Sequence, residues 1–168
     1  MFDLAPTVTT SSAGDPRAPE ATPVVDALLR FGLAQDRRRD PGALALFESA
    51  FTDDAELDFR PAARTCGIEV PLMRGRDMIS NIIMNSGASL DTTHVVTNPR
   101  VNITGEGAAN LTALVEAQHL PTDDHSRHAL LKNLYAVRVV RDADLWRMTS
   151  VYIECVWYTG DPRVITGQ

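Results

Sequence analysis

The C-terminal half of this 168-residue chain consists mainly of long segments with a β-type pattern. They are rich in Val, Ile, Thr and aromatic residues, and short polar or glycine-containing stretches separate them. Four such segments follow one another: Thr92–Ile103, Ala108–His119, Leu130–Arg141 and Leu145–Tyr158. Gly105-Glu106-Gly107 is typical of a hairpin turn between the first two. The pattern therefore predicts a meander of four antiparallel strands.

The N-terminal half has helical periodicity instead. Three helices are expected: Thr22-Pro23 to about Arg37, Asp40-Pro41 to about Ala50, and Asp77–Ser86. Gly87 stands where a C-terminal cap belongs, and a short strand, Asp53–Phe59, separates the second helix from the third. Helices segregated from an antiparallel meander predict an α+β fold with the helices packed on one face of the sheet.

Length and composition fit one globular domain, with 44% hydrophobic and 23% charged residues. We expect residues 1–21, rich in Pro, Ala, Thr and Ser, to form a disordered or subunit-swapped arm, 22–162 the domain, and 163–168 a tail. The net charge of −6 disfavours binding to nucleic acid. No apolar run reaches the length of a membrane span and the N-terminus lacks a signal-peptide pattern, so a cytoplasmic location is expected.

Three polar residues continue apolar faces. Asp36 lies on the inward stripe of the first helix, His119 extends the apolar face of Ala108–His119, and His94 follows Asp91-Thr92-Thr93 at a strand start. A carboxylate on an inward stripe must be paired or near water, because burying it alone costs several kcal/mol. The alternatives are an Asp36 turned to solvent beside Arg37, Arg38 and Arg39, and histidines that are structural or on the surface.

Other kinds of site receive little support. The four histidines show no spacing typical of a metal site, and neither a GxSxG motif nor a glycine-rich phosphate loop occurs. Cys66 and Cys155 are solitary and are expected to be reduced thiols. We therefore expect neither a metal nor a cofactor.

The order of these features resembles a known family. The chain resembles the SnoaL-like branch of the NTF2-like superfamily in five successive features. They are an Asp late in the first helix, the segment FTDDAELDF, a helix introduced by RGRD, the segment TTHVVTNPRVNITGEGAA and a strand ending VVRDADLWRM. That branch includes scytalone dehydratase, hexachlorocyclohexane dehydrochlorinase and polyketide cyclases. The resemblance spans about Pro23 to Asp161. It implies a cone-shaped curved sheet wrapped around three helices, a pocket for a small apolar molecule, and a homodimer or homotrimer.

The resemblance also implies roles for particular residues. Asp36 and His94 match the family's catalytic Asp–His dyad, and His119 matches a second pocket histidine. Gln35 and Phe59 stand where the dehydratase has pocket tyrosines, which implies a more apolar pocket. The remaining substrate-binding candidates are Phe59, Met78, Ile82, Val115, Asn133, Tyr135 and Trp157.

The function expected from these residues is proton abstraction from carbon, leading to elimination, isomerisation or cyclisation of an apolar carbonyl or polyketide-like substrate. His94 would take the proton, Asp36 would fix its tautomer, and His119 would donate a proton to the departing or enolate oxygen. The alternatives are a cyclase that acts only by holding its substrate in an apolar cavity, and a non-catalytic ligand-binding or dioxygenase small-subunit-like protein.

Overall fold

The computed structural model describes residues 8–9 and 18–167. Its helices are α1 (Ala18–Asp36), α2 (Ala43–Ser49), α3 (Arg60–Cys66), α4 (Arg76–Ser86) and the 3₁₀ helix η1 (Pro162–Thr166). Its strands are β1 (Val8–Thr9), β2 (Phe51–Asp58), β3 (Met73–Arg74), β4 (Leu90–Gly105), β5 (Ala108–Pro121), β6 (Ala129–Asp142) and β7 (Leu145–Gly160).

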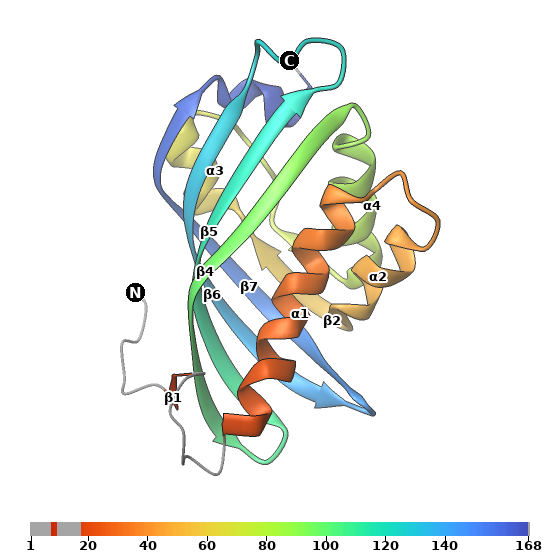
Figure 1. The fold of residues 1–168 in the computed structure, drawn as a ribbon, viewed down its shortest axis with the longest axis vertical. Helices are drawn as coiled ribbons and strands as arrows, with labels where there is room; N and C mark the ends of the chain where they lie inside the picture. Colours follow the sequence, from red (N-terminus) through yellow and green to blue (C-terminus); the bar gives the residue numbers. More distant parts are fainter. Residues whose placement is uncertain (1–7, 10–17, 168) are drawn as a thin grey trace.

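These strands form one sheet in the order β1-β4-β5-β6-β7-β2-β3. Figure 1 shows the four long strands as a curved, twisted sheet, with α1 running alongside it next to α2 and α4. The α+β architecture and the meander of β4 to β7 are confirmed. The sheet is not wholly antiparallel, however, because β2 pairs parallel to β7.

A bulge bends β4. The pairing register between β4 and β5 shifts between Thr97 and Arg100, and Asn98 there adopts a positive φ of 51°. Asn tolerates this left-handed conformation better than most residues, and bulges increase the local twist of a strand. The bulge thus contributes to the curvature that leaves room for a cavity between sheet and helices.

The core fills the space between α1 and the sheet. Alternate residues of β5 are buried, including Leu111, Ala113 and Val115. The ring of Phe31 on α1 packs edge-on against Phe47 and Phe51, with centroids 5.4 and 5.3 Å away. Edge-to-face aromatic pairs stabilise a fold beyond the area that they bury.

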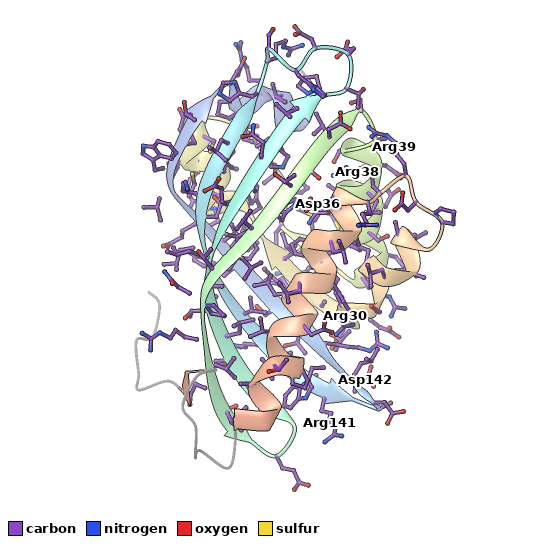
Figure 2. All side chains as sticks on the ribbon, in the orientation of Figure 1. Arg30, Asp36, Arg38, Arg39, Arg141 and Asp142 are labelled. Carbon is purple, nitrogen blue, oxygen red and sulfur yellow. The ribbon has the colours of Figure 1, made fainter. Side chains whose placement is uncertain are left out.

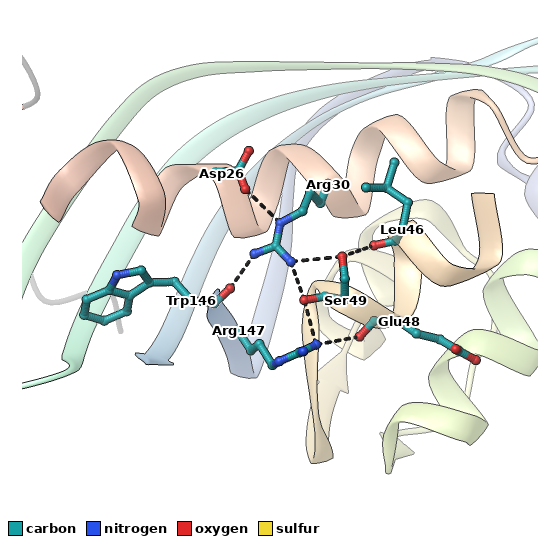
Figure 3. Close-up of polar contacts among 7 residues, drawn as sticks. All are labelled: Asp26, Arg30, Leu46, Glu48, Ser49, Trp146 and Arg147. Atoms are coloured by element: carbon teal, nitrogen blue, oxygen red, sulfur yellow. Dashed lines mark hydrogen bonds and ion pairs between the residues drawn. The ribbon is translucent and has the colours of Figure 1, made fainter. Parts of the chain in front are cut away.

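A buried arginine joins α1 to the end of α2 and to β7 (Figure 3). Arg30, 9% exposed, donates from Nε to Asp26 (2.8 Å), from Nη1 to the hydroxyl and carbonyl oxygens of Ser49, and from Nη2 to the carbonyl of Trp146. Arg147 donates to the same Ser49 carbonyl at 3.0 Å. The guanidinium satisfies carbonyls that would otherwise be left without partners at this junction.

The N-terminal boundary differs from the expectation. Helix α1 begins at Ala18 rather than at Thr22-Pro23, so Pro23 lies inside it and its ring nitrogen donates no hydrogen bond. Of the expected arm, Val8–Thr9 pairs with Arg100 and Val101 of β4, while residues 1–7 and 10–17 lie outside the described residues. Helices α3 and η1 were not expected.

Candidate functional site

A cavity of about 120 Å³ lies between the helices and the inner face of the sheet. Its wall is mostly apolar, with a few polar side chains. The lining residues are Phe31, Gln35, Arg38, Leu57, Phe59, Val70, Met73, Ile82, Ile83, Gly87, Leu90, His94, Ala117, His119, Leu131, Asn133, Tyr135, Ile153 and Ile165. Because an apolar cavity of about 150 Å³ in another protein accommodates benzene, this one has the scale of a single-ring molecule.

His94 and Asp36 form a close pair beside this cavity. His94 Nδ1 lies 2.6 Å from Asp36 Oδ1, and the backbone N–H of His94 donates to Oδ2 at 2.8 Å. Their side chains are only 5% and 20% exposed, respectively. His94 lines the cavity whereas Asp36 does not, so Asp36 reaches a ligand only through the imidazole. With Nδ1 held by the carboxylate, Nε2 is the ring nitrogen left for chemistry.

The surroundings of Asp36 favour its charged form. Burial opposes ionisation, but the hydrogen bonds and charge supplied by His94, with a further bond from the Thr92 hydroxyl at 3.0 Å, outweigh it. Together they hold the pKa of Asp36 below its ordinary value. An ionised carboxylate at Nδ1 can stabilise the positive charge of an imidazolium.

His119 lies on the neighbouring strand, with its ring centroid 5.9 Å from that of His94. Burial is the main cause that lowers the pKa of His119 to about 3, and the positive charge of Arg38 adds to it. Its ring is therefore neutral at pH 7. Its Nδ1 is buried and has no hydrogen-bond partner in the described part of the chain.

Two polar residues of β6 complete the sheet side of the cavity. Asn133 is 1% exposed, and its Oδ1 has no partner within the described residues. Burial raises the pKa of Tyr135, so its hydroxyl stays protonated and can donate a hydrogen bond. Both positions were expected to contact a substrate, and both line the cavity.

Arg38 is a cavity residue that sequence reasoning missed. Figure 2 places it with Asp36 and Arg39 at the end of α1 that lies away from Arg141 and Asp142. Its Nε donates to the carbonyl of Gln35 (2.9 Å) and its Nη2 to the hydroxyl of Thr92 (3.3 Å). The sequence shows three consecutive arginines after Asp36, which is typical of a solvated helix end and hides the inward one.

Gly87 makes room for that side chain. A Cβ added to Gly87 would lie 1.3 Å from Arg38 Nη1, whereas the φ of Gly87, −83°, is open to any residue. The glycine is therefore needed for space beside the guanidinium, and not for the backbone conformation of a helix cap.

The other expected wall residues divide into two groups. Phe59 and Ile82 line the cavity, whereas Met78, Val115 and Trp157 are not among its lining residues. Met78 is 38% exposed, Val115 is buried in the core, and Trp157 is 52% exposed. Trp157 follows the register shift between β6 and β7 at Lys132/Asn133, which changes the face on which the later residues of β7 point.

No three His, Cys, Asp or Glu side chains gather in residues 8–9 and 18–167 as they would around a metal ion. In the same ranges, no helix has both the length and the apolar character of a membrane span.

The comparison with protein families decides the classification. The profile of the SnoaL-like domain matches residues 17–152, most of the chain. The chain belongs to the SnoaL-like family. The SnoaL-like chain is also 33% identical over 144 residues to the Terrestric acid biosynthesis cluster protein E of Penicillium crustosum, an alignment that covers 82% of this chain and 84% of the relative.

Solved structures share the fold of this SnoaL-like chain. A protein from Novosphingobium aromaticivorans assigned as a scytalone dehydratase superposes with a TM-score of 0.71 at 18% identity, covering 84% of this chain and 87% of its own. Hexachlorocyclohexane dehydrochlorinase LinA-type3 from Novosphingobium barchaimii gives 0.69 at 16% identity, covering 87% and 92%. At these identities the likeness establishes the fold alone, and it confirms the NTF2-like architecture.

Proposed function

We propose that the protein is an enzyme that removes a proton from a carbon atom of a small carbonyl compound, with His94 as the base. The observation that carries the proposal is the 2.6 Å contact between His94 Nδ1 and Asp36 Oδ1 at the edge of a largely apolar cavity. Relatives named as a dehydratase, a dehydrochlorinase and a biosynthesis cluster protein support a role in small-molecule chemistry.

In the proposed step, Nε2 of His94 takes a proton from the carbon next to a carbonyl group. The electron pair of the broken C–H bond forms a carbon–carbon double bond, and the π pair of the carbonyl group moves to its oxygen, which gives an enolate. In an elimination the enolate re-forms the carbonyl group and expels the leaving group, and a departing hydroxide takes back the proton held by the His94 imidazolium. Asp36 is the positioning residue, because it holds the ring by Nδ1 and stabilises the positive charge that the ring acquires. A cavity shielded from water keeps the base and the enolate from being solvated.

The role of His119 changes with its low pKa. A ring that is neutral at pH 7 delivers no imidazolium proton, so we assign it a hydrogen bond to the carbonyl or enolate oxygen in place of a proton transfer. Asn133 and Tyr135 line the same cavity and can supply further hydrogen bonds to such an oxygen.

The test uses a probe that reports proton abstraction directly. In D₂O, the enzyme should speed exchange of the α-hydrogens of cyclohexanone, followed by NMR, and elimination of water from 3-hydroxycyclohexanone, followed by ultraviolet absorbance. His94→Ala and Asp36→Asn should each lower these rates by about 10²-fold or more. His125→Ala is the control, because His125 is exposed and outside the cavity. Equal rates for wild type and a folded His94→Ala variant would contradict the proposal.

The apolar wall favours one other function, a cyclase that holds a reactive chain in a folded shape without acid–base chemistry. The variants His94→Ala and Asp36→Asn distinguish this cyclase from the proton-abstracting enzyme. A cyclase of this kind gives no exchange in wild type, and it keeps its activity after loss of either His94 or Asp36. The homodimer or homotrimer expected from the resemblance stays a prediction, for which sedimentation measurements are the test.

A further inference from the structure

Three unpartnered polar atoms belong to residues that line the cavity. They are Nη1 of Arg38, Nδ1 of His119 and Oδ1 of Asn133, each buried and without a hydrogen-bond partner in the described part of the chain. A buried polar group left without a hydrogen-bond partner destabilises the folded chain. Three such groups around one cavity indicate a place for polar atoms of a ligand, within walls that are otherwise apolar.

The charge at this place belongs to Arg38, which forms no ion pair with the described residues, although the carboxylates of Asp36 and Asp91 lie near enough to act on it. Its two neighbours along the chain are exposed and paired, Arg37 with Asp40 (3.7 Å) and Arg39 with Asp91 (2.7 Å). The described contacts of Arg38 are neutral, namely a carbonyl and a hydroxyl. A half-buried guanidinium with one unoccupied N–H edge is well suited to an anionic oxygen.

The same guanidinium is connected to the dyad. Arg38 Nη2 donates to the Thr92 hydroxyl, and that hydroxyl donates to Asp36 Oδ1, the oxygen next to His94 Nδ1. Arg38 and His94 therefore face the cavity from one hydrogen-bonded chain of groups. An anion at Arg38 would lie at the end of the cavity where the base is.

We propose that Arg38, seated against Gly87, binds a negatively charged oxygen of the substrate, a carboxylate or a stable enolate, so that the natural substrate is an organic acid with an apolar body. The inference rests on the proposed function in that it takes the bound acid to be a substrate, but the property it assigns to Arg38 is binding alone. Asn133 presents either its oxygen or its amide NH₂ by rotation, and neutral His119 presents either a donor or an acceptor, so both can adjust to the acid group.

The experiment compares two probes of the same shape, benzoate and benzamide. Each is titrated calorimetrically into the full chain at pH 7 and about 0.15 M salt, where long-range attraction is screened. Wild type should bind benzoate at least about tenfold more tightly than benzamide.

Two variants test the role of Arg38. Arg38→Gln removes the positive charge, and Gly87→Ala keeps the charge but displaces it. Both variants should reduce the ratio of the benzoate affinity to the benzamide affinity to about one. Arg39→Gln is the matched control, since Arg39 is exposed and outside the cavity, and should keep the ratio.

Any of four results would overturn the proposal. Wild type could bind the two probes equally or bind neither of them. The preference for benzoate could survive in both Arg38→Gln and Gly87→Ala, or Arg39→Gln could abolish it equally. If Arg38→Gln fails to fold, Gly87→Ala decides alone, because only the flexible tip of Arg38 has to move. The titration needs no turnover. If the exchange experiment contradicted His94 as the base, the binding result would still stand, and a failure of the binding result would leave the proposed function untouched.

Discussion

Gly32 of α1 lies directly against His94 of β4. A Cβ added to Gly32 would be 3.0 Å from the Cβ of His94 and 3.6 Å from its Cγ. Gly32 lies about one helical turn before Asp36, so the absence of a side chain at residue 32 lets the helix come close enough for the carboxylate to reach the imidazole.

The first prediction concerns this contact. Gly32→Ala should gain about 1 kcal/mol from helix propensity, but the new methyl group must displace His94 and should cancel that gain. In a His94→Gly background the methyl group has space, so the gain should appear in full. A double-mutant cycle of urea unfolding measures the difference, expected at about 1 kcal/mol. Additive effects would show that the two residues do not interfere.

The second prediction concerns Thr92, which is 7% exposed and bridges Asp36 and Arg38. Thr92→Val keeps the shape but removes the hydroxyl. It should cost about 1–3 kcal/mol of stability, because two polar groups lose a partner. Thr92→Ser keeps the hydroxyl and should retain most of that energy. Chemical denaturation of the three proteins checks this, and equal stability of the Val and Ser variants would contradict it.

The third prediction follows from the pKa of His119, about 3 in the folded chain against an ordinary 6.5. As the pH falls below about 6.5, the unfolded chain takes up a proton at this residue and the folded chain does not. Unfolding is therefore favoured increasingly, by about 1–2 kcal/mol between pH 7 and pH 5. Between pH 7 and pH 5 the free energy of unfolding of His119→Gln should therefore fall less than that of wild type, by about 1–2 kcal/mol.

Urea denaturation at the two pH values measures this difference. The same slope in His119→Gln and wild type would show that His119 takes up its proton as easily when folded as when unfolded.

The fourth prediction concerns Arg30. Arg30→Met should lower the free energy of unfolding by about 2–4 kcal/mol, because carbonyls of Ser49 and Trp146 lose a charged donor. Arg37→Met, at a side chain 67% exposed, should change it by less than about 0.5 kcal/mol. Urea denaturation of both variants checks the contrast, and similar losses would mean that the junction is not held by Arg30.

The helices and strands with strong periodicity were predictable from the sequence. The inward position of Asp36 left a solvent-facing side chain open as an alternative, and only the family resemblance implied that Asp36 pairs with His94. Short elements such as Arg60–Cys66 carry too few apolar positions to show a period. The parallel pairing of β2 with β7 joins segments far apart in the sequence, and no local sequence pattern predicts it. Arg38 was missed because the direction of a long side chain depends on the space left by Gly87, far away in the sequence.

The parallel pair of β2 and β7 has a consequence for synthesis. Strand β2 ends at Asp58, while the strand beside which it lies begins at Leu145. At about 5–20 residues per second, a ribosome makes the missing portion in on the order of ten seconds. During that wait the nascent N-terminal half has no partner for one edge of β2, and the carbonyl of Trp146 that Arg30 binds does not yet exist. The junction of α1, β2 and β7 can therefore form only after Leu145–Gly160 has been synthesised.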